Sequence, residues 1–273
     1  MTAKLSELRS HLQRALDGEE ADGLDEFLVA NSFLPGPTEN LELAQTLAGE
    51  MVRHVDSKGV RLWGLVTAWA DVDAGQARAA RPREFLPFCG ALCIGALGAA
   101  SDTWWLSAVD RLRDLATDPR ARVRKGVMLG VRRLLRADFL ATAEELVAWI
   151  EGGRLFTMQV VAQAISDPRL LVDEMNAVAA LALHRALINT YILLPLTYRG
   201  HPDCRPLRKT LAYSLSVAVA ALPEEGFQTM QRWAARTDPD LNWILIQNLT
   251  EPRLADVYQT QTEVLLKMLK TDQ

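Results

Sequence analysis

The sequence predicts an all-α protein, built as a stack of about seven helical hairpins of about 40 residues each. Apolar residues recur with the spacing of an α-helix along nearly the whole chain, and no segment keeps the alternating pattern of a β-strand for long. Leu and Ala dominate, whereas β-branched residues, which favour strands, are sparse. A hydrophobic fraction of 49% and a charged fraction of 23% are typical of a folded chain.

Helix breakers divide this pattern into segments. Where Asp, Ser or Thr precedes Pro, the side-chain oxygen can cap the free N–H groups of a helix start, and Pro needs no donor in the first turn. The breakers lie at Asp17-Gly18, Pro35-Gly36-Pro37, Asp71 to Ala80, Ser101-Asp102, Asp118-Pro119, Gly152-Gly153, Asp167-Pro168, Gly200 to Asp203, Pro223, Asp238-Pro239 and Glu251-Pro252. We expect one domain over residues 1–273, with a looser N-terminal part over residues 1–80.

Two segments bear on where the protein works. The N-terminal residues, Met1 to Glu7, become amphipathic and charged at once and lack the apolar core of a signal peptide. The longest uncharged run, Phe85 to Ala100, contains Pro87 and is shorter than the roughly 20 apolar residues of a membrane-spanning helix, so we expect a buried helix there. Three cysteines suggest no disulfide framework. We therefore predict a cytoplasmic protein with no membrane partner.

The sequence contains no evident catalytic constellation. The four histidines are scattered, and Cys89 and Cys93 share a helix face without a third ligand nearby. Glycine loops that cradle phosphates and nucleophile elbows of the Gly-x-Ser-x-Gly type are absent. We accordingly assign no catalytic residue, no metal ion and no cofactor.

Three stretches share a frame that repeats along the chain. They are Thr117-Asp118-Pro119-Arg120, Ser166-Asp167-Pro168-Arg169 and Thr237-Asp238-Pro239-Asp240. Each is predicted to begin a helix that follows an apolar helix. The first continues as Ala-Arg-Val-Arg-Lys-Gly-Val, and it resembles the HEAT repeat, in which Asp-Pro opens the second helix of a hairpin and Val-Arg follows five residues on.

The resemblance implies a HEAT-like α-solenoid, an α-α superhelix of the armadillo type. Asp118 and Arg124 fall on the positions that this family uses for a structural Asp–Arg ladder between repeats. In the other two frames, Asp173 and Ile244 stand where the ladder arginine would be. The resemblance is therefore specific for one repeat and architectural for the others.

The C-terminal stretch over residues 233–249 resembles the closing repeats of uncharacterised bacterial HEAT-like proteins. Some of these are similar to the alkylpurine DNA glycosylases that are built on HEAT-like repeats. The catalytic Trp and Asp of that glycosylase family match no position in this sequence. The resemblance therefore carries no catalytic role to this chain.

A concentration of positive charge stands out between Asp118 and Arg136. Seven basic residues and one acid give this stretch a net charge of +6, within a chain whose total is −4 and whose pI is about 5.7. On a helical wheel, five of the cations share a face about 100° wide, opposite an apolar face that includes Arg124. We call these five residues the basic stripe; they are Arg122, Lys125, Arg132, Arg133 and Arg136.

The basic stripe has three interpretations. It is the solvated face of an amphipathic helix, compensated by Asp102, Asp110 and Asp114 of the preceding helix, or it binds an anionic protein, or it binds nucleic acid. Like charges one turn apart repel, so an uncompensated stripe favours a partner. Trp104 and Trp105 open the preceding helix, where packing is a more common role for tryptophan than base stacking.

The second helices of HEAT hairpins line the concave surface of the solenoid, so the stripe is a candidate for that groove. Our first hypothesis is a non-enzymatic interaction module that binds a protein or peptide in the groove. The alternative is a DNA- or RNA-binding HEAT-like protein related to the alkylpurine DNA glycosylases. The acidic net charge recruits neither nucleic acid nor an anionic membrane globally, so such a site has to be a local patch.

Overall fold

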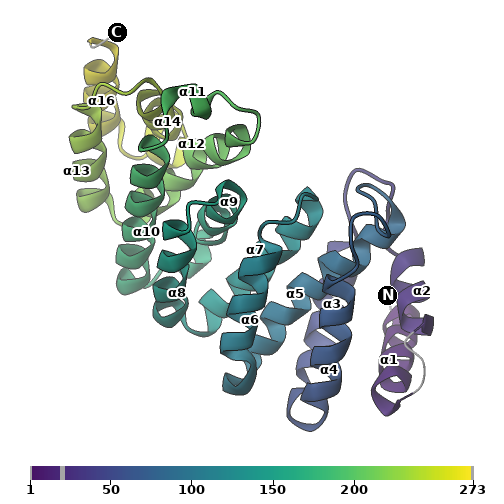
Figure 1. The fold of residues 1–273 in the computed structure, drawn as a ribbon. Coiled ribbons are helices and arrows are strands. Elements are labelled where there is room, and N and C mark those ends of the chain that lie inside the picture. Colours follow the sequence, from purple (N-terminus) through teal and green to yellow (C-terminus); the bar gives the residue numbers. More distant parts are fainter. Residues whose placement is uncertain (1, 19–21, 272–273) are drawn as a thin grey trace. The chain divides into compact units, whose positions relative to one another are not determined.

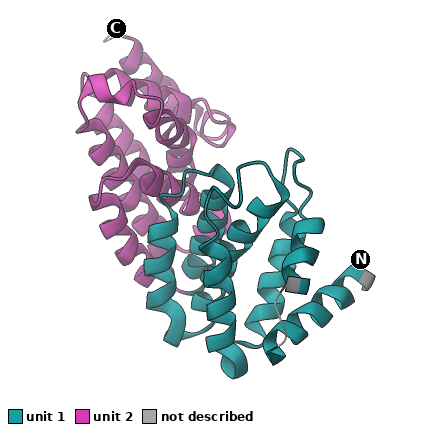
Figure 2. Ribbon diagram, turned by 45° about the vertical axis from the view of Figure 1, so that its right-hand side comes forward, with its two compact units in different colours: residues 1–137 teal, residues 138–273 magenta. Residues whose placement is uncertain are grey.

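The computed structural model describes residues 2–18 and 22–271. Within these residues the secondary structure consists of sixteen α-helices and two short 3-10 helices, without a β-strand (Figure 1). The predicted all-α class is therefore confirmed. The chain divides into two compact units, residues 1–137 and residues 138–273 (Figure 2). The expectation of one domain with a looser part over residues 1–80 stays a prediction.

Unit 1 is organised around one apolar helix. Its helices are α1 (Thr2–Asp17), α2 (Asp22–Ala30), α3 (Leu41–Val52), α4 (Val55–Ala70), the 3-10 helix η1 (Pro82–Glu84), α5 (Phe85–Ala100), α6 (Asp102–Leu115) and α7 (Ala121–Ala137). Helix α5 contacts α2, α3, α4, α6 and α7, and every residue from Phe85 to Gly98 is buried. The expected buried helix is confirmed.

Pro82–Ala100 is also long and apolar enough to cross a membrane by length and composition, but 83% of its most apolar window is buried inside the protein. Helix α7 packs closely against α5, because a Cβ atom on Gly95 would lie only 2.3 Å from the Cα atom of Gly130. This close approach needs glycine on both helices. It fixes which face of α7 turns inward.

Unit 2 is arranged around helix α12, which contacts α9, α10, α13, α14 and α15. Its helices are α8 (Phe139–Glu151), α9 (Leu155–Ala164), the 3-10 helix η2 (Pro168–Leu170), α10 (Glu174–Ile192), α11 (Leu196–Arg199), α12 (Cys204–Ala221), α13 (Pro223–Ala234), α14 (Pro239–Leu249), α15 (Pro252–Ala255) and α16 (Gln259–Thr271). Most consecutive helices of this unit pack together, as short connections favour.

The three Asp-Pro frames begin different kinds of helix. Asp238 accepts hydrogen bonds from the N–H groups of Asp240 and Leu241 and caps α14. Helix α7 begins shortly after the Asp118 frame, at Ala121. The Asp167 frame opens only the 3-10 helix η2, so the predicted helix start is displaced there. The reason is that Asp173, six residues later, caps α10.

Candidate functional site

The basic stripe lies along one face of α7. The opposite face consists of buried Val123, Val127, Val131, Leu134 and Leu135. Four of the stripe cations are half-buried and Arg136 is exposed. The amphipathic helix that the sequence predicted is therefore present, with its apolar and basic faces as expected.

The first two cations of the stripe are neutralised by buried glutamates. Arg122 Nη1 lies 3.1 Å from Glu84 Oε2, and Arg122 Nε lies 3.3 Å from Glu39 Oε2. Lys125 Nζ pairs with the other oxygen of Glu39. Both carboxylates are nearly inaccessible to solvent, so each ion pair is well shielded. These ion pairs therefore hold α7 against the 31–40 loop and η1 within unit 1.

The same cations hold the loop over residues 31–40. Arg122 Nη2 donates to the carbonyl oxygens of Gly36 at 3.2 Å and Pro37 at 3.3 Å. Burial raises the pKa of Glu39, but the ammonium of Lys125 and the guanidinium of Arg122 outweigh it, so the net shift of that pKa is downward. Glu39 thus stays ionised and keeps the loop attached to α7.

The acids that compensate Arg122 and Lys125 are not those that the sequence suggested. Asp102, Asp110 and Asp114 of α6 were the expected partners, whereas the carboxylates beside Arg122 and Lys125 come from the 31–40 loop and from η1. Within unit 1 these segments are distant from α7 along the chain. A local sequence pattern does not predict a contact between residues so far apart in the chain.

The other end of the stripe has a different electrostatic environment. Burial lowers the pKa of Arg133, the Cys93 thiol raises it, and the like charge of Arg136 lowers it further. Neither Arg133 nor Arg136 forms an ion pair with any residue that the structure describes. Arg132 is half-buried beside them on the same helix. Two adjacent guanidinium groups are thus left without a carboxylate partner.

The two tryptophans of α6 are half-buried. Trp104 stacks on Trp63 of α4, with 5.0 Å between ring centroids and 14° between ring planes. Its indole edge also lies against Gly59, where a Cβ atom would come within 2.8 Å of Nε1. Helix packing therefore accounts for Trp104.

An open groove of about 910 Å³ lies beside Trp104 and is also lined by Lys58 and Arg61. These cations are already engaged within unit 1. Lys58 Nζ lies 3.4 Å from Asp17 Oδ1, and Arg61 Nε donates to the carbonyl oxygen of Ala15 at 3.1 Å. The groove thus offers an aromatic wall but little uncompensated positive charge.

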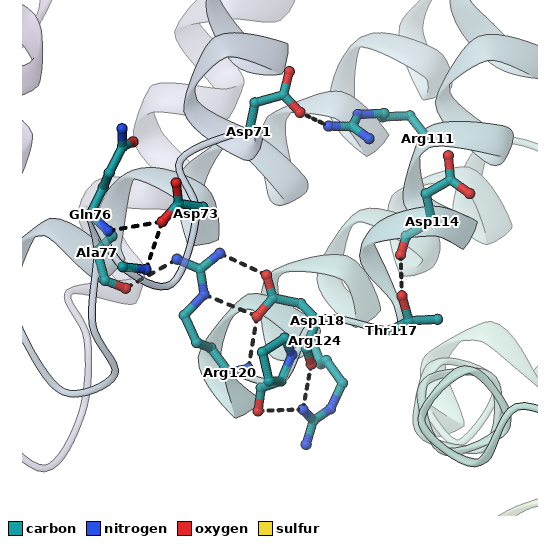
Figure 3. Close-up of polar contacts among 12 residues, drawn as sticks. Asp71, Asp73, Gln76, Ala77, Arg111, Asp114, Thr117, Asp118, Arg120 and Arg124 are labelled. Carbon is teal, nitrogen blue, oxygen red and sulfur yellow. Dashed lines mark hydrogen bonds and ion pairs between the residues drawn. The ribbon is translucent and has the colours of Figure 1, made fainter.

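The ladder positions lie together at the start of α7 (Figure 3). Buried Arg124 donates from Nη1 to the carbonyl oxygens of Asp118 at 2.6 Å and Pro119 at 3.0 Å. The carboxylate of Asp118 instead receives two bonds from the guanidinium of Arg120, at 2.9 and 2.7 Å. Arg120 also donates to the carbonyl oxygen of Ala77 at 3.1 Å. Arg120 therefore links this turn to the loop before α5.

Arg120 was not predicted as a linking residue, although the sequence holds a signal for it. In the second frame Arg169 makes the same two bonds to Asp167, at 2.9 and 2.7 Å. We call this arrangement, in which an Asp-Pro-Arg tripeptide closes on itself, the Asp-Pro-Arg clip. The recurrence of the tripeptide is the signal.

The stripe can therefore act in two ways. Its N-terminal end, with Arg122 and Lys125, is an internal ion-pair cluster, and its C-terminal end, with Arg133 and Arg136, can attract an anion. Guanidinium groups bind carboxylates and phosphates and supply no nucleophile, so this chemistry is binding. Comparison of the chain with protein-family models and with curated proteins finds no match.

Proposed function

We propose that this protein is a non-enzymatic interaction module that binds an acidic segment of a partner protein at the C-terminal end of the basic stripe. The observation that carries the proposal is the pair Arg133 and Arg136, which has no carboxylate partner among the described residues. Arg133 is half-buried, so part of its hydration is already lost. A partner carboxylate would restore that lost interaction.

Helix geometry supports an anion at this position. Arg136 lies in the last turn of α7, where free carbonyl groups favour positive charge, and this compensates part of the repulsion between the two guanidinium groups. Arginine binds carboxylate through two parallel hydrogen bonds, which orients the partner as well as attracting it. Glu or Asp side chains of an extended segment suit such a pair.

We also propose that the two units belong to a HEAT-like α-solenoid of about seven hairpins. The order of packing supports this architecture. Helix α5 packs beside α7 in unit 1, and α12 packs beside α9 and α14 in unit 2, as second helices of successive hairpins do. In that architecture α7 is a second helix and contributes to the concave groove, which is where a partner segment would lie.

The alternative is a DNA- or RNA-binding protein related to the alkylpurine DNA glycosylases. Affinity for nucleic acid grows with the number of phosphates that cations neutralise. Arg122 and Lys125 are already paired with Glu39, and one face of Trp104 is covered by Trp63. Fewer cations and less aromatic surface are left for a polynucleotide, so the acidic peptide is the better supported partner.

Fluorescence anisotropy tests the proposal directly. A labelled Glu-rich peptide, a neutral Gln-rich peptide, a DNA duplex and a DNA single strand are each titrated with the full chain at low and moderate salt. We expect the Glu-rich peptide to bind, and Arg133→Ala with Arg136→Ala to weaken it by about tenfold. The matched control, Arg78→Ala with Arg83→Ala, removes the same charge from exposed positions of unit 1.

The outcomes separate the hypotheses. Equal weakening by both double variants would mean that only net charge matters and would overturn the assignment of the site. Absence of peptide binding at low salt would overturn the proposed function itself. Tight DNA binding with a steep salt dependence would establish the nucleic-acid alternative instead.

A further inference from the structure

Unit 1 contains a second candidate site, a cavity of about 420 Å³ lined by residues of α1, α2, α3 and the 31–40 loop. Its apolar wall consists of Leu5, Leu8, Phe27, Phe33 and Leu43. The volume falls within the range of roughly 300–1,000 Å³ that is usual for small-molecule sites, and apolar walls with a few polar groups are typical of them. The residues of the basic stripe do not line it.

Phe33 lines this cavity in an unfavourable conformation. Its backbone is left-handed, with φ of 65°, a conformation that aromatic residues rarely adopt. The residue is 62% exposed although it is among the largest apolar residues of the chain. Backbone strain and apolar exposure thus coincide at one residue that lines a cavity. Strain of this kind clusters at ligand sites.

The surrounding loop holds Phe33 in this state. The N–H of Gly36 donates to the carbonyl oxygen of Phe33 at 2.8 Å, and a Cβ atom on Gly36 would come within 2.4 Å of that oxygen. The N–H of Leu34 donates to Ser32 Oγ at 3.2 Å. Arg122 anchors the far side of the loop through Gly36 and Pro37, as described above. The backbone that carries the ring is therefore held by contacts within the protein, independently of a ligand.

The polar groups of the cavity favour a neutral ligand. Lys4 and Glu42 carry opposite charges, and Lys4 Nζ donates to Asn31 Oδ1 at 3.0 Å. The amide of Asn40 is occupied, since it accepts from the N–H of Leu43 at 3.1 Å and donates to the carbonyl oxygen of Asn31 at 2.8 Å. A charged ligand would find no excess of opposite charge here.

We propose that this cavity binds a neutral, largely apolar small molecule that packs against the ring of Phe33. The site is separate from the anion site on α7 and goes beyond the function proposed above. The inference stands on the volume, the apolar wall, the balanced charge and the strained, exposed aromatic ring. It does not depend on a protein partner for the basic stripe.

Two related dyes test this inference. N-phenyl-1-naphthylamine is neutral and apolar, and 1-anilinonaphthalene-8-sulfonate adds a negative charge to the same ring system. We expect the neutral dye to bind the full chain saturably with one equivalent, and the sulfonate to bind at least about tenfold more weakly. Equal or tighter binding of the sulfonate would overturn the neutral class of ligand.

A matched pair of variants locates the dye. Thr46→Trp fills the cavity, because Thr46 lines it, whereas Gln45→Trp adds the same side chain one residue earlier at an exposed position. We expect Thr46→Trp to abolish saturable binding of the neutral dye and Gln45→Trp to leave it unchanged. Equal effects, or binding that survives Thr46→Trp, would overturn the assignment of the cavity.

Two substitutions separate the ring of Phe33 from its backbone strain. Phe33→Ala and Phe33→Gly both remove the ring, so both should weaken the neutral dye by about tenfold. Glycine tolerates positive φ, so Phe33→Gly should melt at a higher temperature than Phe33→Ala. Unchanged dye affinity in both variants would remove Phe33 from the site.

Discussion

Arg199 Nη1 lies 2.8 Å from Asp238 Oδ2 and gives the third Asp-Pro frame the guanidinium that it lacks in its own sequence. In the first two frames the arginine stands two residues after the aspartate, as Arg120 and Arg169. The third frame has Asp240 at that position, and Arg199 lies 39 residues away from Asp238. The third frame thus also has an Asp–Arg pair, but its arginine comes from α11 and not from the frame itself.

The first prediction concerns Arg199 itself. It is buried, and it also donates to the carbonyl oxygens of Leu194 and Ile192. Arg199→Ala leaves Asp238 and nearby Asp240 without this cation, so we expect a loss of about 3 kcal/mol in the free energy of unfolding. Urea denaturation followed by circular dichroism measures it.

Arg169→Ala is the control for this experiment. Arg169 closes the same kind of pair with Asp167, but its own side chain is 78% exposed, whereas that of Asp167 is only 4% exposed. Solvent screens a pair whose cation is exposed, so we expect a smaller loss than for Arg199→Ala. Comparable losses in the two variants would contradict the distinction between a buried and an exposed arginine.

The second prediction is a pH dependence from His184. Burial lowers the pKa of His184 to about 4, and the hydrogen bond between its ring and the backbone of Ala180 opposes this shift only in part. In the unfolded chain the imidazole takes up a proton near its ordinary value of 6.5. Between these values only the unfolded state gains the proton. Stability should therefore fall as the pH drops from 6.5 towards 4, by about 3 kcal/mol, with no contribution above 6.5.

Two histidine variants isolate that effect. His184→Leu removes the titrating group, so its unfolding free energy should lose this slope whatever its value at neutral pH. His201→Gln changes an exposed histidine and should keep the slope. Chemical denaturation at several pH values between 4 and 7 gives both curves. An unchanged slope in His184→Leu would contradict the assignment.

The third prediction concerns Glu39, which neutralises Arg122 and Lys125. Glu39→Gln removes the charge at nearly constant shape, and we expect a loss of about 2 kcal/mol because two charge-assisted contacts weaken. The same change frees Lys125 and leaves Arg122 with Glu84 as its one remaining carboxylate among the described residues, so binding of the Glu-rich peptide and of DNA should tighten. Anisotropy and urea denaturation on one preparation measure both. Loss of stability without tighter binding would show that the freed cation is not accessible.

The fourth prediction compares the effect on stability of replacing a tightly packed glycine and an exposed glycine by alanine. Gly95→Ala places a methyl group against Gly130 of α7, so we expect a loss of about 1–3 kcal/mol from overpacking. Gly49→Ala lies within α3 with nothing within 4 Å of the new Cβ atom. It should stabilise the protein by about 0.5–1 kcal/mol, because alanine favours a helix. Changes of the same sign would contradict the packing of α5 on α7.

Local patterns were sufficient for the helical class, for the burial of α5 and for the two faces of α7. Each depends on spacing within one helix, which the sequence shows directly. The partners of the stripe were beyond such patterns. Glu39 is 86 residues from Lys125, and Glu84 is 38 residues from Arg122. The sequence favoured acids on the adjacent helix α6 as partners of these cations. Tertiary packing instead places Glu39 and Glu84 beside Arg122 and Lys125.

The Asp167 frame and Arg120 also show what a local sequence pattern fails to predict. The tripeptide Asp-Pro-Arg precedes the long helix α7 at Asp118 but only the 3-10 helix η2 at Asp167, because Asp173 caps α10. The resemblance to the HEAT repeat suggested Asp118 and Arg124 for a ladder between repeats, whereas the carboxylate of Asp118 pairs with Arg120 of the same turn. A motif of two residues fixes a local hydrogen bond but not the element that follows it.

The Asp-Pro-Arg clip also affects the order in which the chain can fold. A pair separated by two residues closes almost without loss of chain entropy, so the turns at Asp118 and Asp167 can form while the rest of the chain is still unfolded. Asp238 also caps α14 through local hydrogen bonds, but its pair with Arg199 forms only when the segment back to Arg199 has closed. By taking its arginine from α11, the C-terminal frame couples its Asp–Arg pair to the packing of α11 beside the start of α14.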